Sequence, residues 1–324
     1  MSACILPYET VTVKIRNEVM GKGLLTAILL GVCGMISAQE SSGSSAVLDK
    51  MRDVAVADSM RVYSICEIKD GVSRTVDIEP ASKCHNSYSV TKVFVVTAIG
   101  ILEDRGILST EELVYPIFKE QFPVGFDPKW QEVTIDHALR HCIGFEQGFL
   151  DIDCEDIHTY GSDDFLALVL GHPLKWQPGE KGVYSDAAYY LLSRIVSAKT
   201  GQKLDDFLRE ELLKPLHFSE YAFSKCPNGY PIGATGLYIS TTDMAKLGQL
   251  YLQKGKWEGK PILSERFVDK ALGRYELRGS PQEGFAKGGM LGQYLYLDPV
   301  ENRVIAIHSY NGDIGKLMQV VREK

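Results

Sequence analysis

Hydrophobic and polar positions alternate with different periods along the chain and so predict its first elements. Residues 46–57 have apolar side chains at helical spacing, which predicts an amphipathic helix. Residues 61–67 alternate as a strand, and residues 72–78 alternate as the returning strand of a hairpin around an Asp-Gly turn. Residues 93–102 are apolar almost without interruption, which predicts a helix buried in a core.

The rest of the chain predicts helices first and then another hairpin. Helices are expected at residues 133–141, 186–199 and 204–213, after a short helical segment that Ser109 would cap. Residues 290–297 and 303–308 have the alternation of two strands joined by a turn. The predicted strands therefore lie towards both ends of the chain.

Composition places the chain among globular proteins. Of its 324 residues, 45% are hydrophobic and 24% are charged, which fits one large domain or two ordinary ones. The net charge of -7 provides no basic surface for nucleic acid, and beyond the leader no stretch is apolar enough to cross a membrane. We therefore expect a small-molecule or short-peptide substrate as the partner.

Residues 1–38 have the parts of a secretory signal peptide: basic residues, an apolar run at residues 24–36, and small residues before a cleavage site after Ala38. Met20 offers a second translation start. Lipidation of Cys33 is the weaker alternative, because the valine before it is bulky, and the run is short for a membrane anchor. The mature protein is expected in the periplasm or outside the cell.

A Ser-rich linker is expected at residues 39–45, and residues 46–324 are expected to form the folded domain. Five cysteines follow the leader: Cys66, Cys84, Cys142, Cys154 and Cys226. Their number is odd and no Cys-x-x-Cys occurs, so neither a zinc cluster nor a redox pair is indicated. We expect buried single thiols.

Two further patterns contain residue types that bind metals. His137 and His141 lie four apart and could share a zinc ion, but Ala138 stands where a metalloprotease helix has Glu, and no third ligand is evident. The acidic residues in 151–156 lack the central Gly and the terminal Glu of a calcium loop, so a solvated turn is expected. We predict no metal and no organic cofactor.

Ser89 and Lys92 are the first candidates for catalysis. Three residues apart on a helix, they share one face, so the amine can reach the hydroxyl. A serine nucleophile needs such a base, and unpaired N–H groups at the helix start can stabilise developing negative charge. The lysine can act as base only when neutral, which burial or a nearby cation would favour. The alternative is a capping serine that precedes a lysine by chance.

Two later stretches could complete the site. Tyr184 lies on a loop before a helix, from which its phenol can project into a cleft and relay a proton, while Asp186 suits the helix N-cap. Lys287-Gly-Gly289 leads into a strand beginning at Met290, and glycines there let a backbone N–H approach a substrate. The structural alternatives are packing for the tyrosine, capping for the aspartate and a solvated lysine.

Together and in this order, Ser89-Val-Thr-Lys92, Tyr184-Ser-Asp186 and Lys287-Gly-Gly289 resemble the three motifs of the serine β-lactamase and penicillin-binding-protein superfamily. The resemblance is greatest to the group of class C β-lactamases, D,D-peptidases and related esterases. It implies a β-lactamase-like fold of the α/β (α+β) type, a mainly antiparallel sheet flanked by helices. The sheet part would comprise residues 46–88 and about 225–324, and an all-helical region at about 89–224 would be inserted.

The resemblance also implies roles for single residues. Ser89 would be the nucleophile, Lys92 its activating base and Tyr184 the proton relay to the leaving group. The backbone N–H groups of Ser89 and Met290 would form the oxyanion hole.

Departures from the family pattern narrow the expected substrate. Asp186 stands where the family most often has Asn, so a charge replaces an amide donor at a substrate-binding position. Lys287 and Gly289 keep their substrate-binding places, and the lysine could pair with a substrate carboxylate. Gly288 replaces a hydroxyl residue and resembles the esterase branch.

We therefore predict an exported serine hydrolase that cleaves an ester or amide bond through a covalent acyl-enzyme on Ser89. An esterase or a D-amino-acid peptidase is favoured, and a β-lactamase or penicillin-binding D,D-peptidase is the alternative. The alternative from another class is a non-catalytic binding protein of the same fold that holds peptidoglycan-derived fragments or a protein partner.

Overall fold

The computed structural model describes residues 39–40 and 45–323, so the predicted leader at residues 1–38 lies outside the described residues. Of the predicted linker, Gln39–Glu40 form a short strand and Ser45 caps the first helix, while residues 41–44 lie outside the description. No helix in the described part of the chain has both the length and the apolar content that a membrane span needs.

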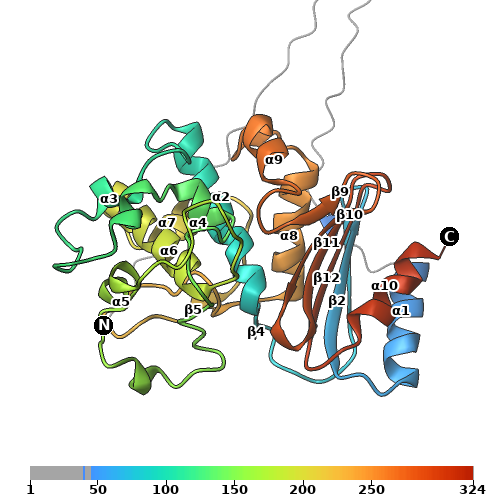
Figure 1. Cartoon of the computed structure of the whole chain (residues 1–324). Helices are drawn as coiled ribbons and strands as arrows, with labels where there is room; N and C mark the ends of the chain where they lie inside the picture. Colours follow the sequence, from blue (N-terminus) through green and yellow to red (C-terminus); the bar gives the residue numbers. More distant parts are fainter. Residues whose placement is uncertain (1–38, 41–44, 324) are drawn as a thin grey trace, which may run out of the picture. The chain divides into compact units, whose positions relative to one another are not determined.

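A seven-stranded sheet is the main scaffold of the described residues (Figure 1). The strands follow the order β1-β3-β2-β12-β11-β10-β9, and neighbouring strands are antiparallel except β1 with β3. Their bounds are Gln39–Glu40 (β1), Val62–Lys69 (β2), Val72–Asp77 (β3), Arg278–Ser280 (β9), Gly284–Gly289 (β10), Gln293–Asp298 (β11) and Arg303–Ser309 (β12). Strands from the two ends of the chain thus meet where β2 pairs with β12.

Both hairpins predicted from the sequence are present. Asp70 and Gly71, with φ of 50° and 79°, join β2 to β3. Positive φ at both central positions is what a type I′ turn requires, and Asp-Gly is a favoured pair for it. β11 and β12 are joined by a longer turn, in which the Asp298 carboxylate accepts hydrogen bonds from the N–H groups of Val300 and Glu301.

Helices cover both faces of this sheet (Figure 1). In β12, Ile305 packs in the cluster that includes α1 (Ala46–Ala57) and α10 (Ile314–Arg322), whereas its neighbour Val304 packs on the side of α8 (Thr241–Leu252). Successive side chains of a strand point to opposite faces, so a strand covered on both faces must be apolar at consecutive positions. This is the pattern of the β12 sequence.

The helices between β3 and β9 in the sequence include the predicted helical region, and α2 is central to it. α2 spans Thr91–Asp104 and is buried continuously as far as Leu102. It contacts α6, α7 and α9, which accounts for its apolar sequence on all sides. The bounds of the other helices are Val114–Ile117 (α3), Ile135–Leu139 (α4), Phe165–Gly171 (α5), Asp186–Thr200 (α6), Leu204–Leu208 (α7) and Glu265–Ala271 (α9).

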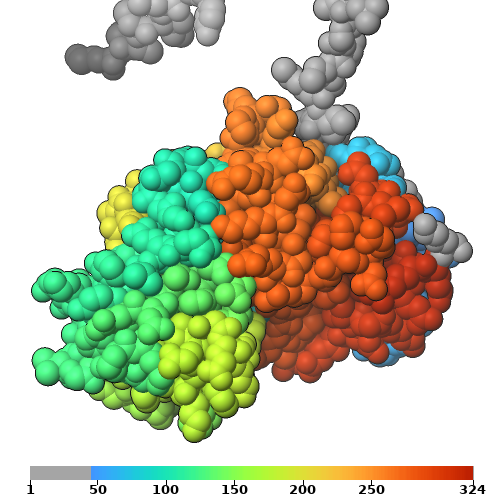
Figure 2. Space-filling view, turned by 45° about the horizontal axis from the view of Figure 1, so that its top comes forward, coloured from blue at the N-terminus to red at the C-terminus, as the bar shows by residue number. Residues whose placement is uncertain are grey.

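α9 is attached to the C-terminal end of α2, and Figure 2 shows the orange part of the chain, which includes α9, against the teal part. Lys270 Nζ lies 3.0 and 3.1 Å from the two carboxylate oxygens of Glu103, and the N–H of Ser264 donates to Asp104 at 2.6 Å. Gly100 permits the close approach, because a Cβ there would lie 2.4 Å from an aromatic ring of α9. The helical region is therefore fixed to the segment that leads into β9.

Two short sheets complete the described fold. β4 (His85–Asn86), β6 (Leu237–Ile239) and β5 (Tyr221–Phe223) pair in that order, and β7 (Lys256–Trp257) pairs with β8 (Lys260–Pro261). Because β4 ends shortly before Ser89, its pairing with β6 sets the place where α2 begins.

Three helix predictions need correction. Ser109 does not cap a helix; its hydroxyl accepts a backbone hydrogen bond within a turn, and α3 begins later. The helix predicted at 133–141 is shorter, because Thr134 is extended and caps it. The helix predicted at 204–213 consists of α7 and a π-helical turn over Arg209–Leu213.

The five described cysteines are free thiols. Cys66, Cys142 and Cys226 are buried, as expected, whereas Cys84 is half-buried and Cys154 is exposed. Burial raises the pKa of the Cys66 thiol, so this cysteine stays protonated and packs as a small apolar side chain.

Candidate active site

Ser89 lies in a three-ten turn, Tyr88–Val90, that leads directly into α2. The α-helix itself begins at Thr91, after this turn. The spacing still brings the side chains together, because Lys92 Nζ lies 3.2 Å from Ser89 Oγ. Residues three apart in a three-ten turn also share a face, so the predicted juxtaposition does not depend on the helix type.

Asn86 holds this turn in position. Its Oδ1 accepts hydrogen bonds from the N–H groups of Tyr88 at 2.8 Å and Gly236 at 3.1 Å, and so connects two segments that are far apart in the sequence. Tyr88 has φ of 44°, a left-handed conformation that is unfavourable for a bulky residue. The chain therefore turns sharply just before Ser89.

Lys92 is completely buried and has three hydrogen-bond acceptors. Nζ donates to Ser89 Oγ at 3.2 Å, to Asp186 Oδ1 at 2.7 Å and to the carbonyl oxygen of Ala234 at 2.8 Å. An ammonium group has three N–H donors, so these acceptors match its charged form. The resting site therefore holds a fully bonded lysine beside the serine hydroxyl.

Asp186 is not the N-cap that the sequence predicted. Ser185 occupies that position, and Asp186 is the first residue of α6. Its carboxylate is only 7% exposed and pairs with Lys92. The local sequence does not show whether an aspartate is the N-cap or the first residue of the helix. Here the difference depends on Lys92, which lies 94 positions away in the sequence and pairs with Asp186.

Tyr184 also contacts the Ser89 hydroxyl. Its OH donates to Ser89 Oγ at 2.7 Å, and its ring lies 4.5 Å from that of His141. Burial raises the pKa of the Tyr184 phenol, and the charge of Lys287 and the Ser89 hydrogen bond lower it only in part. The phenol is therefore protonated at neutral pH and is placed to donate its proton.

Lys287 belongs to a buried charged group that the sequence did not reveal. Its Nζ lies 3.5 Å from the Tyr184 OH but only 2.5 Å from Glu276 Oε2. The other oxygen of Glu276 lies 2.8 Å from His141 Nε2. The N–H of Ser185 donates to His141 Nδ1 at 3.2 Å, so the neutral tautomer with a proton on Nε2 fits this arrangement.

The Glu276 carboxylate largely neutralises Lys287, which changes the role predicted for that lysine. Burial alone would raise the pKa of Glu276, but the hydrogen bond from His141 and the charge of Lys287 hold it well below its usual range. Glu276 carries no recognisable motif, and His141 was considered only as a zinc ligand with His137. His137 instead accepts a hydrogen bond from Thr134 through Nδ1 and completes the cap of α4.

Replacing Glu276 with glutamine should lower the free energy of unfolding at pH 7 by roughly 3 kcal/mol, because it leaves the Lys287 ammonium, whose side chain is only 11% exposed, without its charged partner. The folded-state pKa of Glu276 lies below the unfolded value, so its stabilisation is complete above about pH 4.5 and is lost as the pH falls further. Urea unfolding at pH 7 and pH 3 should show a smaller difference between wild type and variant at pH 3.

Glu283→Gln is the matched control, because Glu283 is an exposed carboxylate close to Glu276 in the sequence. It should change stability by less than about 0.5 kcal/mol at either pH. An equal loss of stability in the two variants would mean that the buried pair with Lys287 contributes nothing specific.

Gly289 brings the end of β10 against the turn that carries Ser89. A Cβ on Gly289 would lie 2.8 Å from the carbonyl oxygen of Ser87 and 3.3 Å from the nitrogen of Ser89. The next residue, Met290, begins a three-ten turn in which Leu291 has φ of 60°. Met290 therefore directly follows Gly289, which packs against the Ser89 nitrogen. An oxyanion hole formed by the backbone N–H groups of Ser89 and Met290 would require such an arrangement.

The acidic segment 151–156 differs from the solvated turn that the sequence predicted. Asp151 and Asp153 are half-buried. One carboxylate oxygen from each of them and one carboxylate oxygen of Asp186 lie within 4.8 Å of one another. We call these three residues the acidic cluster. Burial raises the pKa of Asp153, and the charge of Asp186 raises it further.

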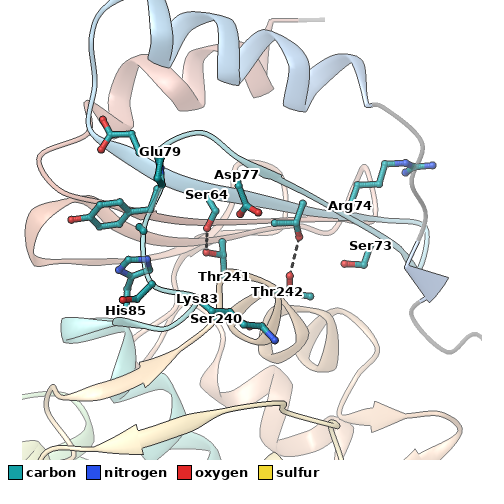
Figure 3. A pocket seen from close by; sticks show the side chains of 15 residues that line it. Ser64, Ser73, Arg74, Asp77, Glu79, Lys83, His85, Ser240, Thr241 and Thr242 are labelled. Carbon is teal, nitrogen blue, oxygen red and sulfur yellow. Dashed lines mark hydrogen bonds between the residues drawn. The ribbon is translucent and has the colours of Figure 1, made fainter.

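A cavity of about 750 Å³ lies elsewhere, between β2, β3 and the start of α8 (Figure 3). Two hydrogen bonds between hydroxyl groups cross this cavity. One joins Ser64 to Thr241, and the other joins Thr75 to Thr242 at 2.9 Å. Neither Ser89 nor Lys92 lines this cavity. These hydroxyls therefore connect the sheet to α8 and take no part in the candidate site.

The family model described as "Beta-lactamase" matches residues 80–313. Among curated proteins, N-acetylmuramyl-L-alanine amidase of Bacillus subtilis (strain 168) is 31% identical over 149 residues, which are 44% of this chain and 34% of that protein. The chain spans only 21% to 34% of the length of the first curated relatives that it matches.

Two solved structures are similar over most of the chain. A penicillin binding protein from Bacillus halodurans has a TM-score of 0.65 and 16% identity, covering 84% of this chain and 99% of that one. A family VIII carboxylesterase has a TM-score of 0.66 and 14% identity, covering 87% and 98%. These similarities confirm the predicted fold.

Proposed function

The chain belongs to the beta-lactamase family, and from this premise we propose that it is a serine hydrolase that cleaves an ester or amide bond through an acyl-enzyme on Ser89. The observation that carries the proposal is the double hydrogen bond at Ser89 Oγ. Lys92 Nζ approaches it at 3.2 Å and the Tyr184 OH at 2.7 Å, so one hydroxyl is within reach of a base and of an acid.

Bond formation and proton transfer can be assigned to these groups. Lys92 acts as the base after its ammonium group, which its three acceptors match, has released one proton to solvent. Ser89 Oγ then attacks the carbonyl carbon of the substrate, and its proton passes to the neutral amine of Lys92. The N–H groups of Ser89 and Met290 stabilise the oxyanion. Tyr184 donates its proton to the leaving group and recovers one from Lys92, so the net result is transfer of one proton from serine to leaving group. Water then hydrolyses the acyl-enzyme by the reverse path.

Within this class, an esterase or a D-amino-acid peptidase is favoured over a β-lactamase or D,D-peptidase. The substrates of the latter two present a carboxylate, for which Lys287 would be the expected partner. Here Glu276 already holds Lys287 at 2.5 Å. Gly288 has no hydroxyl group that could donate to such a carboxylate. The space around it does not explain the glycine, because a Cβ at this position would lie no closer than 3.8 Å to another group.

The proposal includes export to the periplasm or beyond, and it rests on the sequence of residues 1–38. A small molecule or short peptide, with peptidoglycan fragments among the candidates, would then be the substrate. No metal or organic cofactor is needed for the chemistry proposed.

Labelling with a neutral fluorophosphonate tests the function directly, because the reagent forms a covalent bond only with an activated serine. We expect one adduct per folded chain, located on Ser89 by peptide mass, and no adduct after denaturation. The Ser162→Ala variant, which removes an exposed hydroxyl, should label like wild type. Absence of an adduct in folded protein would favour a non-catalytic binding protein of the same fold.

A further inference from the structure

The cavity between β2, β3 and the start of α8 has the size of a ligand-binding site (Figure 3). Its volume of about 750 Å³ lies within the usual range of sites that bind small molecules. Ser89, Lys92 and the residues of the acidic cluster do not line it. A ligand in this cavity would therefore occupy a site separate from the candidate active site.

Asp77 and Lys83 line the cavity with opposite charges. Both side chains are exposed, and neither has an ion-pair or hydrogen-bond partner among the described residues. Figure 3 shows Asp77 on the side of the strands and Lys83 on the opposite side, with Thr241 and Thr242 between them in this view. The two charges do not pair with each other, so a ligand that carries both a positive and a negative group can contact each of them.

The other charged side chains along the cavity have different surroundings. Glu79 Oε2 lies 3.9 Å from Arg61 Nε, so this carboxylate already has a cation beside it. Figure 3 shows the Arg74 side chain extending away from the hydroxyl groups of the cavity. Asp77 and Lys83 are therefore the charges that remain for a ligand.

Two histidines close to the cavity carry no charge at pH 7. His85 lines it, and burial lowers the pKa of its imidazole below the ordinary value. His308 is completely buried, and its Nδ1 lies 2.9 Å from the Thr241 hydroxyl. Burial lowers the pKa of His308 to about 3. Neither ring therefore adds positive charge to that of Lys83.

We propose that this cavity binds a short peptide with both ends free, its ammonium group at Asp77 and its carboxylate at Lys83. This site goes beyond the proposed hydrolase function and does not depend on it. A neutral saccharide would use neither charge, and an anion without a positive group would lie against the Asp77 carboxylate. A zwitterionic peptide uses both charges.

The hydroxyl groups of the cavity suit the backbone of such a peptide. Thr75 and Thr242 share one hydrogen bond at 2.9 Å, which uses the proton of one hydroxyl and leaves that of the other free. Each oxygen also keeps a lone pair that can accept from an N–H group. A peptide group needs an acceptor for its N–H and a donor for its C=O, and this pair of threonines provides both.

The test uses di-, tri- and tetraglycine, because these achiral peptides hold the two charges at different separations. Each is compared with its N-acetyl derivative and its C-terminal amide by titration calorimetry at pH 7, with the Ser89→Ala protein, which lacks the proposed nucleophile. We expect roughly millimolar dissociation constants and, for at least one length, a preference of about threefold to fivefold for the free peptide over either derivative. The preference should weaken at high salt, which screens exposed charges.

Two variants test the two charges separately. Asp77→Asn should abolish the preference over the N-acetyl derivative and keep the preference over the amide, and Lys83→Gln should do the reverse. Both side chains are exposed, so both variants should fold like the parent protein. Arg74→Gln is the matched control, because it removes a charge that lines the same cavity but extends away from the hydroxyl groups. Both preferences should remain in it.

The inference would be overturned by equal affinities for the free peptides and their derivatives, or by no binding at concentrations up to about 20 mM. Loss of both preferences in Arg74→Gln would also contradict it. Tighter binding of cellobiose than of the peptides would mean that the cavity holds a saccharide instead. Preferences that persist in Asp77→Asn and Lys83→Gln would place the peptide outside this cavity. Fluorophosphonate labelling of Ser89 is independent of these results, so either proposal can fail alone.

Discussion

Replacing Ser89 with alanine is expected to abolish hydrolysis of p-nitrophenyl butyrate, with kcat/KM falling at least about a thousandfold. The substitution removes the atom that would form the covalent bond, while Lys92 keeps two of its three acceptors, Asp186 and Ala234. Stability should therefore change little. Steady-state kinetics, together with the intact mass of protein trapped during turnover, would measure both the loss of activity and the loss of the acyl adduct.

Ser87→Ala is the matched control, because Ser87 is buried two residues away and its Oγ has no hydrogen-bond partner among the described residues. Its activity should remain within a fewfold of wild type. If Ser89→Ala retained wild-type turnover, another residue would be the nucleophile. The chromogenic cephalosporin nitrocefin separates the branches, since rapid turnover of it would show that Asp186 and Gly288 are compatible with a β-lactamase.

Replacing Lys92 with methionine is expected to have two large effects. The base is lost, so kcat should fall by about a hundred- to ten-thousandfold. The Asp186 carboxylate, which is only 7% exposed, is also left without its cation, so the free energy of unfolding should fall by roughly 3–5 kcal/mol. Kinetics with p-nitrophenyl butyrate and urea unfolding measure the two effects separately.

The double variant Lys92→Met with Asp186→Asn distinguishes catalysis from structure. It removes both buried charges, so much of the lost stability should return, whereas activity should remain low because no base is restored. Recovery of activity together with stability would contradict the assignment of Lys92 as the base. It would mean that the lysine acts only by holding the site together.

The elements that could be predicted from the sequence are those determined by neighbouring residues. The β2–β3 turn needs positive φ at two positions, and Asp70-Gly71 provides them. The helix α1 was predicted with the bounds that it has, because its apolar spacing and the cap by Ser45 are both local. Two helix ends were predicted less well, because the spacing of apolar residues continues beyond the end of the helix. A threonine cap begins α4 later than this spacing indicates, and a π-helical turn at Arg209–Leu213 follows α7.

The three motifs in order were enough to predict the family and the fold, and they contain Lys92 and Tyr184, whose side chains contact Ser89. The Ser89–Lys92 contact is local, since three residues in a turn already bring the two side chains together. The contact of Tyr184 with Ser89, across 95 positions, followed only from the resemblance. Whether Ser89 is the nucleophile remains a prediction for the labelling experiment.

By itself, the sequence determined the two hairpins, the buried helix and the order of the motifs, because these depend on periodicity and turn chemistry within a few residues. Only the tertiary structure decided the charges of the site. It placed Glu276 against Lys287, Asp186 against Lys92, and the acidic loop beside both Asp186 and Thr235. Electrostatic interactions depend on distance and burial after folding, and the residues of these pairs, 11 positions apart for Glu276 and Lys287 and 94 for Lys92 and Asp186, carry no local sign that they will meet.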